Sequence, residues 1–144
     1  MNTFTFFNLP SCWWSGVRCK KIYAEKCDVT VKHNWFNKNP FNSLYFAVQA
    51  MAAELTTGAL VMFYIKRYDI KLSMLVVEND SIFIKKATGV IRFTCNEGEQ
   101  IKQAVKSARK TGDPQTIWVE SIGRNQTGEE VSRFRFKWSL RLKR

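Results

Sequence analysis

The most uneven distribution of hydrophobic and polar positions lies between Phe41 and Ile65, where Glu54 is the only charged residue. A run of about twenty apolar residues is the usual length of a membrane-spanning helix. A carboxylate at the centre of such a span costs roughly 2.5–3.5 kcal/mol, however, and this run also contains the polar residues Asn42 and Ser43. The pattern therefore favours a helix buried by the rest of the protein, with a transmembrane helix as the alternative.

The boundaries of this helix are marked by residues that commonly begin and end helices. Pro40 pushes the residue before it toward an extended conformation, and Asn42 or Ser43 is placed to accept hydrogen bonds from the amides of a first turn. Lys66 and Arg67 carry the charge that suits the C-terminal end of a helix dipole. The sequence thus predicts a central helix over residues 42–68.

Glu54 lies on a stripe of small residues along this helix. At helical spacing the stripe contains Ala47, Ala50, Gly58 and Val61. A stripe of small side chains lets a backbone, a sheet face or a ligand approach the carboxylate closely. One interpretation of Glu54 is therefore functional, and the other is a structural acid that pairs with a cation or hydroxyl across a dimer.

Alternating patterns in the remainder of the chain predict an antiparallel sheet. We expect strands over residues 27–35, 72–77, 81–87, 90–94, 116–122 and 131–142, and a second helix over residues 99–110. Glu78, Asn79 and Asp80 are expected to form the turn between the second and third of these strands. Residues 1–22 are expected to form an N-terminal helical segment. Because a helix that is apolar nearly all round needs cover on most sides, we predict a single α+β domain, residues 1–144, with a curved antiparallel sheet wrapped around the central helix.

Charge and cysteine content narrow the classes of function. The chain has 144 residues and a net charge of +11, which favours nucleic acid, an anionic membrane surface or a phosphate-bearing small molecule as a partner. The last strand alternates aromatic and cationic residues, so its aromatic side chains face away from its cations, which argues against nucleic-acid binding. The four cysteines have no metal-ligand spacing with the single histidine, His33, so we expect reduced thiols, a cytoplasmic location, and neither metal nor cofactor.

The stretch from Asn39 to Gly58 resembles a known family. It contains NPFNS before the helix and AAELTTG within it, and in these motifs the chain resembles the hotdog-fold acyl-CoA thioesterase superfamily. It is most similar to a domain-of-unknown-function branch, and it also resembles the phenylacetyl-CoA thioesterase-like members. The likeness extends from the Leu9–Trp14 segment to the last strand. It implies a hotdog fold, an acyl-CoA or other thioester substrate, and a homodimer or dimer of dimers whose sites form between subunits.

The resemblance also implies roles for particular residues. In the phenylacetyl-CoA thioesterase-like proteins a His-Gly-Gly motif begins the central helix and an acid lies two turns further on. Without gaps, the motif falls on Tyr45, Phe46 and Ala47, and the acid falls on Glu54. Glu54 is then the implied general base or nucleophile, and the amide of Phe46 or Ala47 polarises the thioester carbonyl. Asn39 is implied to orient the water or the thioester.

Further substrate contacts are expected from polar and small residues around the helix start and on the sheet: Asn42, Ser43, Tyr45, Gly58, Asp80, Lys85 and Lys86. The two lysines are candidates for the phosphates of coenzyme A. Because Tyr45-Phe46-Ala47 replaces His-Gly-Gly, a phenylalanine side chain enters the space that glycine leaves for substrate. The alternative function is therefore a non-catalytic hotdog protein that binds an acyl or aromatic ligand or only assembles. A basic nucleic-acid-binding module is less favoured.

Overall fold

The structure is a computed structural model, and it describes residues 1–143. Two short helices come first, followed by two strands that pair with each other, a long central helix and the remaining elements. In chain order the elements are α1 (Asn2–Asn8), α2 (Pro10–Trp14), β1 (Arg18–Ile22), β2 (Cys27–Lys32), α3 (Phe46–Arg67), β3 (Leu72–Phe83), β4 (Val90–Cys95), α4 (Gly98–Thr111), β5 (Gln115–Arg124) and β6 (Glu130–Leu142).

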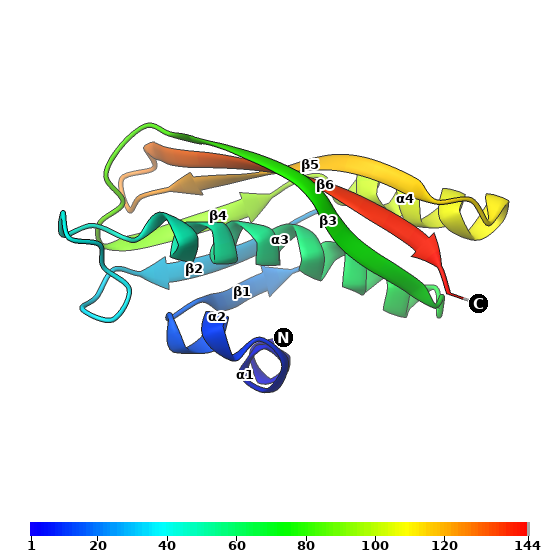
Figure 1. The fold of residues 1–144 in the computed structure, drawn as a ribbon, viewed down its shortest axis with the longest axis horizontal. Coiled ribbons are helices and arrows are strands. Elements are labelled where there is room, and N and C mark those ends of the chain that lie inside the picture. Colours follow the sequence, from blue (N-terminus) through cyan, green and yellow to red (C-terminus); the bar gives the residue numbers. More distant parts are fainter. Residues whose placement is uncertain (144) are drawn as a thin grey trace.

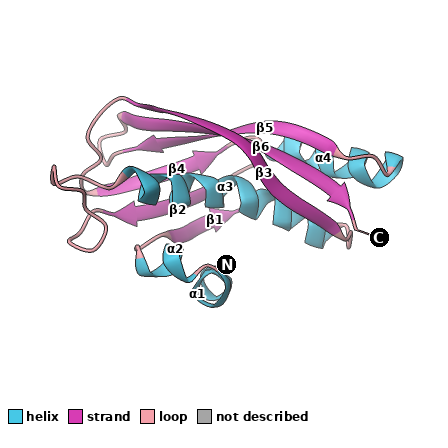
Figure 2. Ribbon diagram, in the orientation of Figure 1, coloured by secondary structure: helices cyan, strands magenta, loops and turns pink. Residues whose placement is uncertain are grey.

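The strands form a six-stranded sheet in the order β1-β2-β4-β5-β6-β3, and every neighbouring pair is antiparallel. Figure 1 shows this sheet curving around α3, with β1 and β3 as its two edges. Figure 2 shows α1 and α2 beside β1, outside the sheet. The predicted α+β architecture, a curved antiparallel sheet around a long central helix, is confirmed.

The central helix α3 is largely buried by the rest of the protein. It contacts β1, β2, β4, β5 and β6, and it also packs against α2 and α4. By length and composition α3 could cross a membrane, but 61% of its most apolar window is buried inside the fold. Burial in the core therefore accounts for its hydropathy, as in the core helix of a globular domain.

Two predicted boundaries near the N-terminus are wrong. Residues 1–22 are not all helical, because Arg18–Ile22 forms β1 and pairs with β2. The strand expected over residues 27–35 ends at Lys32. There the side chain of Asn34 accepts hydrogen bonds from the amides of Phe36 and Asn37, which turns the chain away from the sheet. Residues 33–35 accordingly leave the sheet, and the last of them is 80% exposed.

The central helix begins at Phe46 rather than at residue 42, and neither Asn42 nor Ser43 caps it. The Asn39 side chain accepts hydrogen bonds from the amides of Phe41 and Ser43, and Asn42 has a left-handed backbone with a φ of 59°. These features commit the segment to a tight loop, which excludes a helical turn there.

The turn expected at Glu78, Asn79 and Asp80 is wrong as well. β3 runs without interruption from Leu72 to Phe83, with a bulge between Val76 and Glu78. Polar residues in the middle of a strand are tolerated here because they pair across to β6, where Glu78 faces Lys137. Of the strand expected over residues 81–87, only residues 81–83 are in a strand, and they are the end of β3. The chain then crosses to β4.

Candidate functional site

Glu54 projects from the middle of α3 at a partly exposed position. Its Oε1 lies 3.2 Å from the point that a Cβ on Gly58 would occupy. Burial of the carboxyl raises the pKa of Glu54 above its usual value. Within residues 1–143, no hydrogen-bond donor or cation pairs with this carboxylate. The site therefore has an acid that is desolvated and not neutralised by its own chain.

Trp138 of β6 forms one wall beside the acid. The Cζ2 atom of its indole lies 3.3 Å from the same Cβ position on Gly58. Its Nε1–H donates a hydrogen bond of 2.9 Å to Oγ1 of Thr57, which donates one of 2.8 Å to the backbone carbonyl of Glu54. In the sequence, Trp138 is only one of the alternating aromatic residues of the last strand, and nothing local links it to α3.

Helix α2, which packs against α3, carries the buried residue Cys12. Burial, and to a lesser degree the charge of Glu54, raise the pKa of the Cys12 thiol to about 11. A thiol that stays protonated at neutral pH is a poor nucleophile. Cys12 is therefore not a candidate nucleophile, although the Glu54 charge influences it, and no local pattern in the sequence links the two residues.

The start of α3 offers unpaired backbone amides. Tyr45 is the N-cap and provides no side-chain cap, and the amides of Val48 and Gln49 bond to its carbonyl. The amides of Phe46 and Ala47 have no recorded acceptor among the described residues. Such amides, at the positive end of the helix dipole, stabilise a developing oxyanion.

The aromatic side chains at this helix start lie on the surface. Phe46 is 56% exposed, and its ring makes edge-to-face contacts with the rings of Tyr45 and Phe83. The amide of Phe46 is eight residues before Glu54, and a helix rises about 1.5 Å per residue, so the two groups lie about 12 Å apart along α3. One chain therefore does not bring this amide and the acid to the same carbonyl carbon.

Asn39 lies in the loop before α3, and its polar atoms are already engaged. Its Oδ1 accepts hydrogen bonds from two amides of its own loop, and its Nδ2 donates to Oγ of Ser43 at 2.9 Å. Asn39 and Ser43 thus stabilise the loop. Asn42, between them, is exposed and sits beside a different cleft, which His33 and Trp35 also line.

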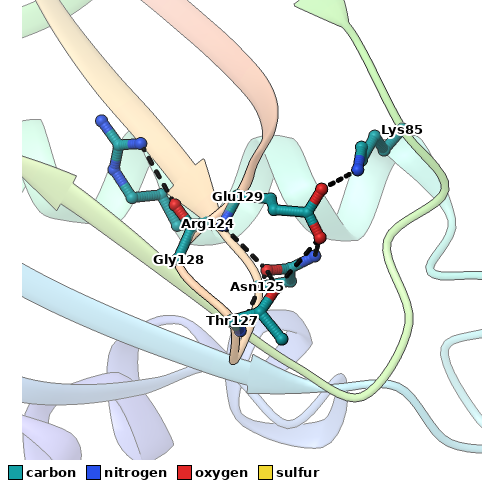
Figure 3. Close-up of polar contacts among 6 residues, drawn as sticks. All are labelled: Lys85, Arg124, Asn125, Thr127, Gly128 and Glu129. Carbon is teal, nitrogen blue, oxygen red and sulfur yellow. Dashed lines mark hydrogen bonds and ion pairs between the residues drawn. The ribbon is translucent and has the colours of Figure 1, made fainter.

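Lys85 and Lys86 do lie near the helix start. Together with Asn39, Ser43 and Phe46 they line a cleft of about 340 Å³. Lys85 forms an ion pair with Glu129, whose backbone amide bonds to the side chain of Asn125 in the β5–β6 hairpin (Figure 3). Lys86 donates to the carbonyl of Phe41 at 3.3 Å. Because both lysines are exposed, these contacts cost little to break.

Asp80 lies apart from Glu54 in this chain. It faces Arg135 across the β3–β6 pair and forms an ion pair with it, and this guanidinium holds the pKa of Asp80 below its usual range. Phe134 and Phe136, on either side of Arg135, are buried on the inner face of the sheet, so Asp80 and Arg135 are on the outer face.

The cationic face of β6 is largely paired with acids. Arg133 pairs with Glu120 and Glu130, and Lys137 pairs with Glu78. The outer face of the sheet therefore offers less free positive charge to a polyanion than its sequence indicates. Among residues 1–143 there is also no group of three or more metal-ligating side chains.

Comparison with solved structures identifies the fold. PA5026 from Pseudomonas aeruginosa, described as a protein of unknown function and probable thioesterase, has a TM-score of 0.85 at 22% identity, covering 99% of this chain and 93% of its own. OLEI01261 from Chlorobaculum tepidum TLS, of unknown function, has a TM-score of 0.85 at 16% identity, with 99% and 92% covered. A Q49A mutant of thioesterase PA1618 from Pseudomonas aeruginosa has a TM-score of 0.72 at 12% identity, with 99% and 91% covered. The chain has the hotdog fold of these thioesterase-like proteins.

The family follows from the sequence itself. Residues 2–140 match the family described as Domain of unknown function (DUF4442), and the chain belongs to that family. No curated protein sequence matches this one. The resemblance to a domain-of-unknown-function branch of the hotdog superfamily is confirmed, while identities below 25% bear on the fold alone.

Proposed function

We propose that this protein hydrolyses an acyl or aryl thioester of coenzyme A, with Glu54 as general base or nucleophile. The observation that carries the proposal is the desolvated carboxylate on α3, lying against Gly58 with no recorded partner in its own chain. Its lone pairs are free to take a proton from water or to attack an acyl carbon. In the general-base route, water adds to the carbonyl carbon as Glu54 takes its proton, the C–S bond breaks, and coenzyme A leaves as a thiolate that is then protonated.

The active unit in this proposal is a homodimer. The amides of Phe46 and Ala47 are about 12 Å along the helix from the acid of the same chain, so the carbonyl that they polarise is attacked with the help of Glu54 from the second chain. β3 supports such an assembly, since it is an edge strand with unpaired backbone groups and exposed apolar side chains. These are Leu75, Val77, Ile82 and Phe83.

Coenzyme A would approach along the cleft at the helix start. Lys85 and Lys86 line this cleft together with Phe46, and their ammonium groups suit the phosphates of the coenzyme A moiety. The exposed ion pair between Lys85 and Glu129 opens at little cost, because an exposed pair is worth roughly 0–1 kcal/mol.

A second candidate function is a non-catalytic hotdog protein that binds an acyl or aromatic ligand. The observation that favours it is the Phe46 side chain, which stands at the helix start where the related enzymes have glycine. Asn39 adds support, since its side chain is occupied within its own loop. Such a protein binds acyl-CoA without releasing coenzyme A.

The test measures the release of free thiol from a panel of acyl- and aryl-CoA substrates, with the wild type and with Glu54→Gln. We expect turnover that falls at least about a hundredfold in the variant. Glu99→Gln on the exposed face of α4 is the matched control and should keep the full rate. Full activity of Glu54→Gln would rule out Glu54 as the general base or nucleophile. Acyl-CoA binding without any thiol release would establish the non-catalytic function instead.

A further inference from the structure

A second cleft lies between α1, β1 and the C-terminal half of α3, away from the helix start. Its volume is about 420 Å³, within the range of roughly 300–1,000 Å³ that is usual for small-molecule sites. The lining side chains are apolar except for that of Lys66, and they belong to Met1, Phe4, Ile22, Ala59, Met62, Phe63, Ile65 and Lys66. Glu54 and the residues at the helix start are not part of it.

The wall that α1 contributes to this cleft is fixed in place. The Asn2 side chain donates a hydrogen bond of 3.1 Å to the carbonyl of Cys19 on β1, and it accepts one of 2.8 Å from the amide of the same residue. Thr5, one turn further along α1, is fully buried. Since α1 is anchored by both residues, the cleft exists before any ligand enters, which reduces the entropic cost of binding.

The charge at the rim comes from Lys66. This exposed lysine has no recorded acidic partner within residues 1–143, and it lies in the last turn of α3. The C-terminal end of a helix dipole is negative and disfavours an anion, and the Lys66 ammonium is the cationic side chain of the lining that can attract one. A ligand that satisfies both features has an apolar body and a single anionic group at one end.

The size of the cleft limits the apolar body. The lining part of α3, from Ala59 to Lys66, spans about 10 Å, the length of an extended chain of roughly eight to ten carbons. Met62 and Ile65 offer flexible and branched aliphatic surfaces, without the polar groups that would orient a functionalised ligand. We propose that this cleft binds a medium-chain fatty acid, with its hydrocarbon chain along α3 and its carboxylate at Lys66. This site is separate from the proposed hydrolytic site.

The test is calorimetric titration with decanoate below its micelle concentration, beside hexanoate, octanoate and dodecanoate. We expect saturable binding of one molecule per chain, with affinity rising about fourfold per methylene until the cleft is full. Met62→Trp, which fills the cleft, and Phe4→Ala, which removes part of the α1 wall, should each weaken decanoate binding at least tenfold. Circular dichroism shows whether each variant folds, and the second variant keeps the test valid if the first does not fold.

The head group is tested by charge reversal. Lys66→Glu should weaken decanoate binding at least tenfold and leave decanol binding unchanged, whereas Lys110→Glu, the same charge change on α4, should affect neither. Glu54→Gln should bind decanoate as the wild type does, so a failed thioesterase assay does not bear on this site. Unsaturable binding, or binding that Met62→Trp leaves unchanged, would overturn the proposal. So would self-association that Met62→Trp abolishes while decanoate has no effect, because the cleft would then be an interface between copies.

Discussion

The indole Nε1–H of Trp138 donates a hydrogen bond of 2.9 Å to Oγ1 of Thr57, and this bond joins β6 to α3 directly beside the candidate acid. Thr57 in turn bonds to the residue that carries the acid, since its hydroxyl donates to the backbone carbonyl of Glu54 at 2.8 Å. The edge of the same indole packs over Gly58. The position of Glu54 therefore depends on a residue of the sheet as well as on the helix that carries it.

Trp138→Phe should lower the free energy of unfolding by about 1–3 kcal/mol, because it removes one buried hydrogen bond and the edge of the ring that packs over Gly58. Turnover should fall more than this loss alone explains, because the wall beside Glu54 changes. Urea unfolding and thiol-release kinetics measure the two effects. Trp118→Phe, on the outer face beside Arg135, is the control and should leave turnover unchanged. Equal kinetics for the two variants would show that Trp138 does not position the acid.

Gly58→Ala tests the close approach between the helix and the acid. Alanine in a helix interior gains about 1 kcal/mol over glycine, but here its Cβ would lie 3.2 Å from Oε1 of Glu54 and 3.3 Å from the Trp138 ring. We therefore expect stability to change by less than about 1 kcal/mol and turnover to fall at least tenfold, as the carboxylate is displaced. A variant that is more stable and fully active would contradict this role of Gly58.

The cleft at the helix start is tested by Glu129→Gln, which removes the ion-pair partner of Lys85. The freed ammonium should bind coenzyme A more tightly, by up to about fivefold if the exposed pair is worth roughly 1 kcal/mol. Lys85→Gln should weaken the binding, and raising the salt concentration should reduce the difference between the two variants. Affinities for coenzyme A that are the same in both variants would remove Lys85 from the proposed phosphate site.

The fold was predictable from the sequence because two of its signals are local. The apolar run around Glu54 identified the buried helix, and the alternation of β6, with Phe134 and Phe136 buried on its inner face, identified the sheet that covers it. The errors fell where a non-local contact or a loop decides the conformation. Glu78 and Asp80 look like turn residues, but the continuous antiparallel pairing of β3 with β6 keeps them in a strand, where they face Lys137 and Arg135.

The candidate site was only partly predictable. The position of Glu54 on a stripe of small residues is a sequence property, and so is the order of residues at the helix start. The wall that Trp138 forms is not, because this residue comes from β6 and lies beside Glu54 through tertiary packing alone. The separation of Asp80 from Glu54 likewise depends on the face of the sheet that β3 presents, which the bulge after Val76 helps to set.

The raised pKa of Glu54 predicts how stability depends on pH. In the unfolded chain the carboxyl has its ordinary pKa near 4.5, whereas burial raises its pKa in the folded protein. Below the ordinary value both states hold the proton, and no charge is buried. As the pH rises between the two values, the unfolded state releases its proton first, so the free energy of unfolding of the wild type falls.

Glu54→Gln cannot ionise and should not show this fall. Above the folded-state pKa the variant should therefore be more stable than the wild type, and the difference should vanish in acid, below the ordinary pKa of a glutamate. Urea unfolding of both proteins from about pH 4 to about pH 8 measures it. Glu99→Gln, on the exposed face of α4, controls for the loss of a carboxylate as such. If Glu54→Gln were less stable than the wild type at neutral pH, the carboxylate would have to gain a stabilising partner in the assembled protein, as a structural acid does.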